Sequence, residues 1–195
     1  MDKQDSVKPT AETLANSARV ASKRGLPPVH KWNPPFCGDL DIRIARDGTW
    51  FYLGTPIGRA PLVKLFSSIL RKDGDDYFLV TPVEKVGIRV DDAPFVAIDF
   101  EVSGEGASQE IQFVTQTEDE MTAGPDNPIR VANDPETGEP SPYILVRDRL
   151  EALIDRKSFY RLVDIGEHQN HGGNRWFGVR SQGQFFPIIE RDKLI

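Results

Sequence analysis

The sequence predicts an α+β fold made of two tandem, structurally related motifs of antiparallel strands with one helix each, preceded by an N-terminal helix and a proline-rich arm. Short apolar or alternating segments bounded by turn residues indicate antiparallel strands. Two segments carry apolar residues at helical spacing, and the order of elements occurs twice. We place the helix and arm at residues 1–38, the first motif at 39–116 and the second at 117–195, and leave open whether the motifs share one core.

Composition restricts the class of protein. With 38% hydrophobic residues in 195, the chain can bury a core, and its net charge of -6 argues against a nucleic-acid binder. No segment approaches the roughly 20 apolar residues of a membrane span, and none resembles a signal peptide. The single Cys37 fits a reducing compartment. We therefore expect a soluble cytoplasmic protein.

The N-terminal region is expected to form a short helix followed by an extended arm. Thr10 can cap the helix, Leu14 and Ala18 share its apolar face, and Gly25 ends it. The four prolines within 27–35 cannot continue a helix, because proline fixes φ and crowds the preceding residue.

The stretch 41–81 is the best marked part of the first motif. Ile42 and Ile44 alternate with polar residues, which indicates a half-buried strand. Asp47-Gly48 is typical of a tight hairpin turn, and 50–53 is the returning strand.

A helix follows this hairpin, with Pro61 in its first turn and Gly74 after its end, and strands are expected at 77–80 and 86–90. The apolar stripe of the helix consists of Leu62, Leu65, Phe66, Ile69 and Leu70.

In the second motif, Leu150, Leu153 and Ile154 predict a helix over 147–156, followed by a strand over 159–165. A polar loop is expected over 166–174, before the last two strands.

Two local matches support the duplication. The segment IRIA at 42–45 resembles IRVA at 129–132, and Arg59 precedes its leucines at the same offsets as Arg147. The alternative is that two unrelated α+β segments share a helix stripe by chance.

Three motifs carry a resemblance to a bacterial family of unknown function: WNPP at 32–35, GTWxYxGTPIxR at 48–59 and LVTPVEKVGI at 79–88. The resemblance covers nearly the whole chain. It implies tandem repeated α+β motifs in an unusual fold and a role in signal transduction without a defined ligand. It implies no catalytic residue.

Polar and aromatic side chains near element ends form the candidate binding site. Arg59 lies near a helix start, where the dipole favours anions, so it is expected to face Glu84 or an anionic ligand. The alternative for Arg59 and Glu84 is a structural salt bridge. For Trp50 and Tyr52 the alternative is packing in the core. The candidate residues are Trp50, Tyr52, Thr55, Arg59, Thr81, Glu84 and Lys85.

Metal and nucleophile chemistry receive weaker support. His168 and His171 stand three residues apart in the predicted loop, without the helical frame of zinc signatures, so solvated histidines are the simpler interpretation. Cys37 lacks a base nearby in sequence and is expected to be structural. We predict no cofactor and no metal.

The resulting hypothesis is a non-enzymatic module that binds a small ligand or a protein partner in a signalling or regulatory role. No phosphate-binding loop or hydrolase signature occurs in the sequence. One alternative is a hydrolase-like enzyme whose site is assembled non-locally from acidic residues and His168 or His171. Another is a structural homo-oligomer. The sequence identifies neither a ligand nor an oligomeric state.

Overall fold

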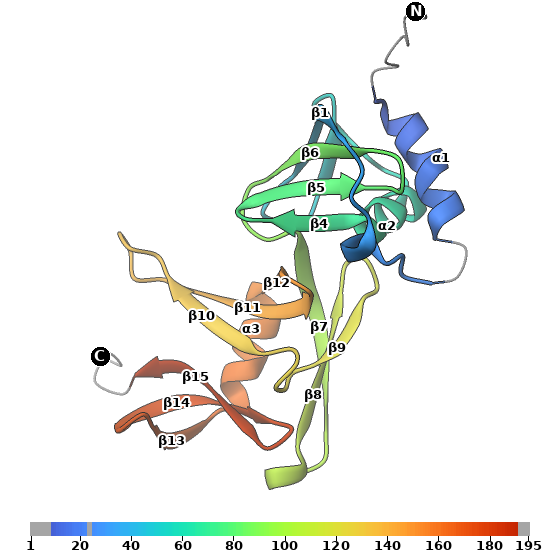
Figure 1. Ribbon diagram of the computed structural model, residues 1–195. Helices are drawn as coiled ribbons and strands as arrows, with labels where there is room; N and C mark the ends of the chain where they lie inside the picture. The colour runs from blue at the N-terminus through green and yellow to red at the C-terminus, as the bar shows by residue number, and fades with distance from the viewer. Residues whose placement is uncertain (1–8, 23–24, 191–195) are drawn as a thin grey trace, which may run out of the picture. The chain divides into compact units, whose positions relative to one another are not determined.

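The computed structural model describes residues 9–22 and 25–190 of the chain (Figure 1). The chain divides into two units, Met1–Asp92 and Ala93–Ile195. The predicted α+β class is confirmed, since both units combine sheets with helices. The motif boundary drawn from the sequence, after residue 116, falls within the second unit.

The first unit contains a six-stranded sheet. Its strands are β1 (Phe36–Ile44), β2 (Trp50–Tyr52), β3 (Thr55–Pro56), β4 (Leu70–Asp73), β5 (Asp76–Val80) and β6 (Lys85–Val90). They lie in the order β3-β2-β1-β6-β5-β4. The central pair, β1 and β6, is parallel, whereas every other neighbouring pair is antiparallel. The sheet is therefore two three-stranded meanders joined along their first and last strands.

Two helices accompany this sheet, α1 (Ala11–Ala21) and α2 (Ala60–Ser68). The predicted N-terminal helix is confirmed, and the Thr10 hydroxyl accepts a hydrogen bond from the Thr13 N–H at 3.2 Å. Leu14 and Ala18 of α1 are fully buried, and α1 packs against α2 (Figure 1). Packing of its apolar face holds α1 in the unit.

The proline-rich arm contains the short 3₁₀ helix η1 (Val29–Lys31) and runs beside β4. Arg71 of β4 binds it, because its Nη1 donates to the carbonyl oxygens of Val29 at 3.0 Å and Trp32 at 2.8 Å. Its Nη2 donates to Asp73 at 2.8 Å. One guanidinium thus connects two carbonyl groups of the arm to β4 through charge-assisted hydrogen bonds.

The second unit contains another six-stranded sheet. Its strands are β7 (Phe95–Ser103), β8 (Glu110–Thr115), β9 (Glu120–Thr122), β10 (Ile129–Asn133), β11 (Pro140–Arg147) and β12 (Leu150–Ile154). They lie in the order β10-β11-β12-β7-β8-β9, with β12 parallel to β7 and all other neighbours antiparallel. The 3₁₀ helix η2 (Gly106–Ser108) connects β7 to β8.

The sheets of the two units have the same topology. In each, the first strand of one meander pairs in parallel with the last strand of the next. The predicted duplication is confirmed as a repeat of sheet topology. The local sequence match used to support it is wrong, because the matched segments lie on strands that are not equivalent in the two sheets. The IRIA segment lies on β1, the first strand of its sheet, and the IRVA segment lies on β10, the fourth strand of the other.

The second unit continues beyond its duplicated sheet with α3 (Arg156–Asp164) and a three-stranded antiparallel sheet. The strands are β13 (Glu167–His171), β14 (Asn174–Ser181) and β15 (Gln184–Glu190). Asp155 caps α3 by accepting the Ser158 N–H at 2.7 Å. The predicted loop at 166–174 is wrong, since most of it is β13 paired with β14.

The predicted helix over 147–156 and the strand over 159–165 are also wrong. Residues 150–154 form β12, in which Leu150, Ala152 and Ile154 are buried, and the helix is α3. The segment satisfies period 2 as well as the helical spacing, and parallel pairing with distant β7 selects the strand. Arg147 lies at the end of β11 in an ion pair with Asp119 at 2.5 Å, so it is no counterpart of Arg59.

The end of α2 differs from the prediction as well. The helix stops at Ser68, and Gly74 turns the β4–β5 hairpin instead, with a φ of 63° that favours glycine. Leu70 pairs with Leu79 across this hairpin. Ile69 and Leu70 are buried, as expected for residues of the apolar helix stripe. Their burial explains why the helical spacing predicted a helix that extends beyond Ser68.

Candidate functional site

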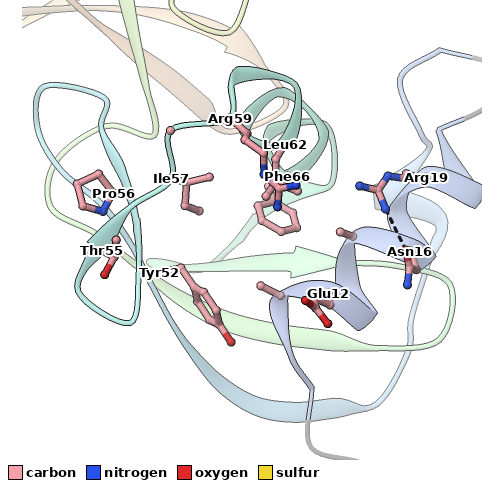
Figure 2. Close-up of a pocket in the computed structure, with 13 residues that line it drawn as sticks. Glu12, Asn16, Arg19, Tyr52, Thr55, Pro56, Ile57, Arg59, Leu62 and Phe66 are labelled. Carbon is pink, nitrogen blue, oxygen red and sulfur yellow. Dashed lines mark hydrogen bonds between the residues drawn. The ribbon is translucent and has the colours of Figure 1, made fainter.

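A cavity of about 550 Å³ lies in the first unit between α1, the β2–β3 hairpin and the start of α2 (Figure 2). This volume is within the usual range for small-molecule sites, about 300–1,000 Å³. The lining residues are Ala11, Glu12, Ala15, Asn16 and Arg19 of α1, Tyr52, Thr55, Pro56, Ile57 and Gly58 of the hairpin and following loop, and Arg59, Leu62 and Phe66 at α2.

The α1 wall is polar and charged. Glu12, Asn16 and Arg19 recur four and three residues apart, so they share one helix face, and all three are exposed. The Arg19 Nη1 donates to the Asn16 Oδ1 at 2.9 Å, which holds the guanidinium at the cavity (Figure 2).

The floor of the cavity is apolar and continuous with the core. Phe66 is fully buried by its neighbours, and its ring stacks on that of Trp50 with centroids 6.3 Å apart and planes at 24°. Leu62 and Ile57 are half-buried beside it. A ligand in the cavity would therefore meet hydrocarbon on one side and charged side chains on the other.

Arg59 occupies the N-cap position of α2, at the mouth of the cavity. Among the residues that the structure describes, no side chain caps this helix, and its first turn contains no acidic residue. Within 9–22 and 25–190, the Arg59 side chain has no ion pair or hydrogen bond, and it is exposed. The expected pairing with Glu84 is not formed. A cation thus stands at the positive end of a helix dipole, an arrangement that an anion would stabilise.

The structure brings three of the predicted site residues to this cavity, namely Tyr52, Thr55 and Arg59. Trp50 is not among the lining residues; it is 1% exposed and packs in the core, which was the alternative interpretation. Its stacking on Phe66 nevertheless places its indole directly behind the floor.

The other three predicted residues lie in and after the β5–β6 turn, away from the cavity lining. Thr81 is buried, and its hydroxyl accepts the Glu84 N–H at 3.2 Å. Lys85 lies over the Phe78 ring, 4.5 Å from its centroid, and its Nζ is 3.5 Å from Asp73. These contacts hold the turn, and nothing in them points to a ligand.

Glu84 connects this turn to α1. Burial raises the pKa of its carboxyl group, and a hydrogen bond from Ser17 of α1 opposes that rise. The carboxylate therefore helps to position the helix that forms one wall of the cavity.

His168 and His171 are exposed on β13, where their rings contact Phe177 and Phe185 at centroid distances of 5.3 and 5.9 Å. In the described part of the chain, no group of three or more metal-ligating side chains is assembled. Cys37 is exposed on β1, and its Sγ donates to the Pro35 carbonyl oxygen at 3.4 Å.

Sequence reasoning did not find the α1 wall of the cavity. The spacing of Glu12, Asn16 and Arg19 was a usable signal, since it predicts one polar face on the N-terminal helix. Their relation to Arg59 depends on packing of α1 against α2, which is a contact between residues far apart in the chain.

Together, the fold and the cavity define a class: an α+β protein with a duplicated six-stranded sheet, in which the first copy bears a charged, apolar-floored pocket. The chain belongs to the DUF1285 family. Residues 27–93 match the domain of unknown function (DUF1285), N-terminal domain, and residues 94–188 match the protein of unknown function (DUF1285), C-terminal domain. The resemblance inferred from the sequence motifs is confirmed.

Solved structures agree with this assignment. A DUF1285 family protein from Silicibacter pomeroyi DSS-3 is 60% identical, with a TM-score of 0.85, and the match covers 93% of this chain and 97% of that one. A DUF1285 family protein from Shewanella baltica OS155 is 30% identical, with a TM-score of 0.50 and coverage of 64% and 91% respectively. No curated protein matches the chain significantly. Among the described residues, no helix has the length and apolarity needed to cross a membrane.

Proposed function

We propose that this protein is a non-catalytic binding module with a signalling or regulatory role, and that the cavity between α1, α2 and the β2–β3 hairpin takes a small organic anion. The observation that carries the proposal is Arg59 at the start of α2, whose side chain has no partner among the described residues. A helix N-terminus favours negative charge, so an anionic ligand would stabilise this arrangement of Arg59 and α2.

The rest of the cavity supports the same proposal. Arg19 contributes a second cation, already oriented by Asn16. Binding sites for small molecules are mostly apolar concave surfaces with a few polar groups that orient the ligand, and Phe66, Leu62 and Ile57 supply the apolar part here.

The proposal is tested by thermal denaturation of the wild-type protein with a panel of small carboxylates, phosphates and sulfonates, each paired with a neutral analogue. A ligand present at 100 times its Kd stabilises the folded state by about 2.7 kcal/mol. For a unit the size of Met1–Asp92, this corresponds to an increase in Tm of roughly 10–20 °C. At least one class of anion is expected to produce such a shift, and its neutral analogue is not.

Arg59→Ala and Arg89→Ala serve as a matched pair in this assay. Arg89 is exposed on β6 and does not line the cavity. The shift should disappear in Arg59→Ala and remain in Arg89→Ala. Equal shifts in the two variants, or no shift with any anion in the wild type, would contradict the proposal.

A further inference from the structure

We infer that the ligand of this cavity is a monocarboxylate with an apolar body, of the medium-chain alkanoate or arylalkanoate kind. The inference rests on the proposed function and narrows it, since it distinguishes carboxylates from phosphates and apolar bodies from polar ones. Its basis is the combination, in one cavity, of one guanidinium without a partner among the described residues, a net charge of one positive unit and an apolar floor on which Ile57 and Leu62 are half-buried.

The charge of the cavity fits a monoanion. Among its lining residues, Arg19 and Arg59 are cationic and Glu12 is anionic, which leaves one net positive charge. In Figure 2 the two guanidinium groups lie on the upper side of the cavity, and the Glu12 carboxylate and Tyr52 hydroxyl lie on the lower side. A carboxylate carries one negative charge, whereas a phosphate monoester carries about 1.5 to 2 at pH 7. Glu12 would repel that excess charge.

The donors also fit a carboxylate. A guanidinium presents two parallel N–H groups that match both oxygens of one carboxylate. The Arg59 guanidinium has no partner in the described residues, so its fork is open, while Arg19 already donates one N–H to Asn16. One planar, two-oxygen acceptor therefore satisfies the available donors.

The floor selects an apolar body. Phe66, Leu62 and Ile57 border the cavity with hydrocarbon, and Ala15 faces them from α1 without adding a polar group. Each buried methylene strengthens binding by about fourfold, as expected from the transfer free energy of a CH₂ group. Affinity should then rise with chain length until the cavity of about 550 Å³ is filled.

Titration calorimetry with the full chain at pH 7.5 tests the inference with four probes: octanoate, butyrate, octyl phosphate and octanol. Octanoate is expected to bind at least tenfold more tightly than each of the others. Arg59→Ala should weaken octanoate binding by about tenfold to a hundredfold, because a charge-assisted hydrogen bond is lost. Arg59→Lys, which retains the charge but not the fork, should weaken it severalfold, and Arg89→Ala should leave it unchanged.

Glu12→Gln provides a second, independent readout. Removing this negative charge should strengthen octyl phosphate binding by threefold or more relative to octanoate, because repulsion of the second phosphate charge is relieved. Circular dichroism establishes that each variant is folded before titration.

The outcomes separate the two proposals. Tighter binding of octyl phosphate than of octanoate, or equal binding of octanol, would overturn the carboxylate inference and leave an anion-binding pocket. Equal binding of butyrate and octanoate would overturn the inference that the cavity prefers a ligand with an apolar body. Absence of any Arg59-dependent binding, with these probes and with the wider anion panel, would overturn both proposals.

Discussion

Replacing Phe66 with alanine removes the side chain that joins the cavity floor to the core of the first unit. Phe66 is fully buried, and it stacks on Trp50, which is itself 1% exposed. Truncation of a buried phenylalanine costs about 3–5 kcal/mol through lost transfer energy and the cavity left behind. Of this, the stacked pair accounts for about 0.5–1.5 kcal/mol. The loss is a large part of a typical folding free energy of about 5–15 kcal/mol.

Urea denaturation followed by tryptophan fluorescence measures this loss. Trp32 and Trp50 lie in the first unit and Trp176 in the second, so a Trp176→Phe background makes the signal report the first unit. Leu62→Ala is the matched control, because Leu62 borders the same cavity but is only half-buried. Its cost should stay below about 2 kcal/mol.

A cost below about 1 kcal/mol for Phe66→Ala would refute the placement of this ring between Trp50 and the cavity. Equal costs for Phe66→Ala and Leu62→Ala would do the same, since the two side chains differ in burial. A change in Trp50 emission on truncation is also expected, because the indole loses its stacking partner.

Three further predictions concern stability. Arg71→Met should cost about 2–4 kcal/mol in urea denaturation, because two arm carbonyls and one carboxylate lose a charged donor; a neutral effect would show that the arm is held by other contacts. Gly178→Ala should lower the free energy of unfolding by about 1–3 kcal/mol, since its Cβ would lie 2.2 Å from the Phe186 carbonyl oxygen. The control is Gly58→Ala, whose Cβ would meet no atom within 4 Å, so its free energy of unfolding should stay within about 0.5 kcal/mol of the wild type. Burial raises the folded-state pKa of Glu84, so the stability of the wild type should fall as pH rises from 4.5 through that pKa. Glu84→Gln should lack this loss and be more stable than the wild type at pH 8. The same dependence of stability on pH in the variant and the wild type would contradict the assigned burial.

Local chemistry was sufficient to predict the β1–β2 hairpin and the N-terminal helix. Asp47-Gly48 and the alternation of Ile42 and Ile44 are signals that act within a few residues, as is the Thr10 cap. The boundary between helix and strand at 150–165 could not be predicted this way. Residues 150–154 satisfy both periods, and the parallel partner that selects the strand, β7, begins more than 50 residues earlier.

The candidate site was predictable only in part for the same reason. Tyr52, Thr55 and Arg59 are close in sequence, and all three line the cavity. Their partners on α1 come from a segment about 40 residues away, and only helix packing brings them together. Thr81, Glu84 and Lys85 were grouped with them because polar residues at strand ends resemble site residues, although here they stabilise a turn.

A crystal structure of the protein grown with octanoate tests the cavity most directly. We expect the carboxylate to lie about 2.7–2.9 Å from two nitrogens of the Arg59 guanidinium, and the alkyl chain to lie on the half-buried side chains of Ile57 and Leu62. Octanoate bound elsewhere, or bound in the cavity with its carboxylate turned away from Arg59, would contradict the assignment.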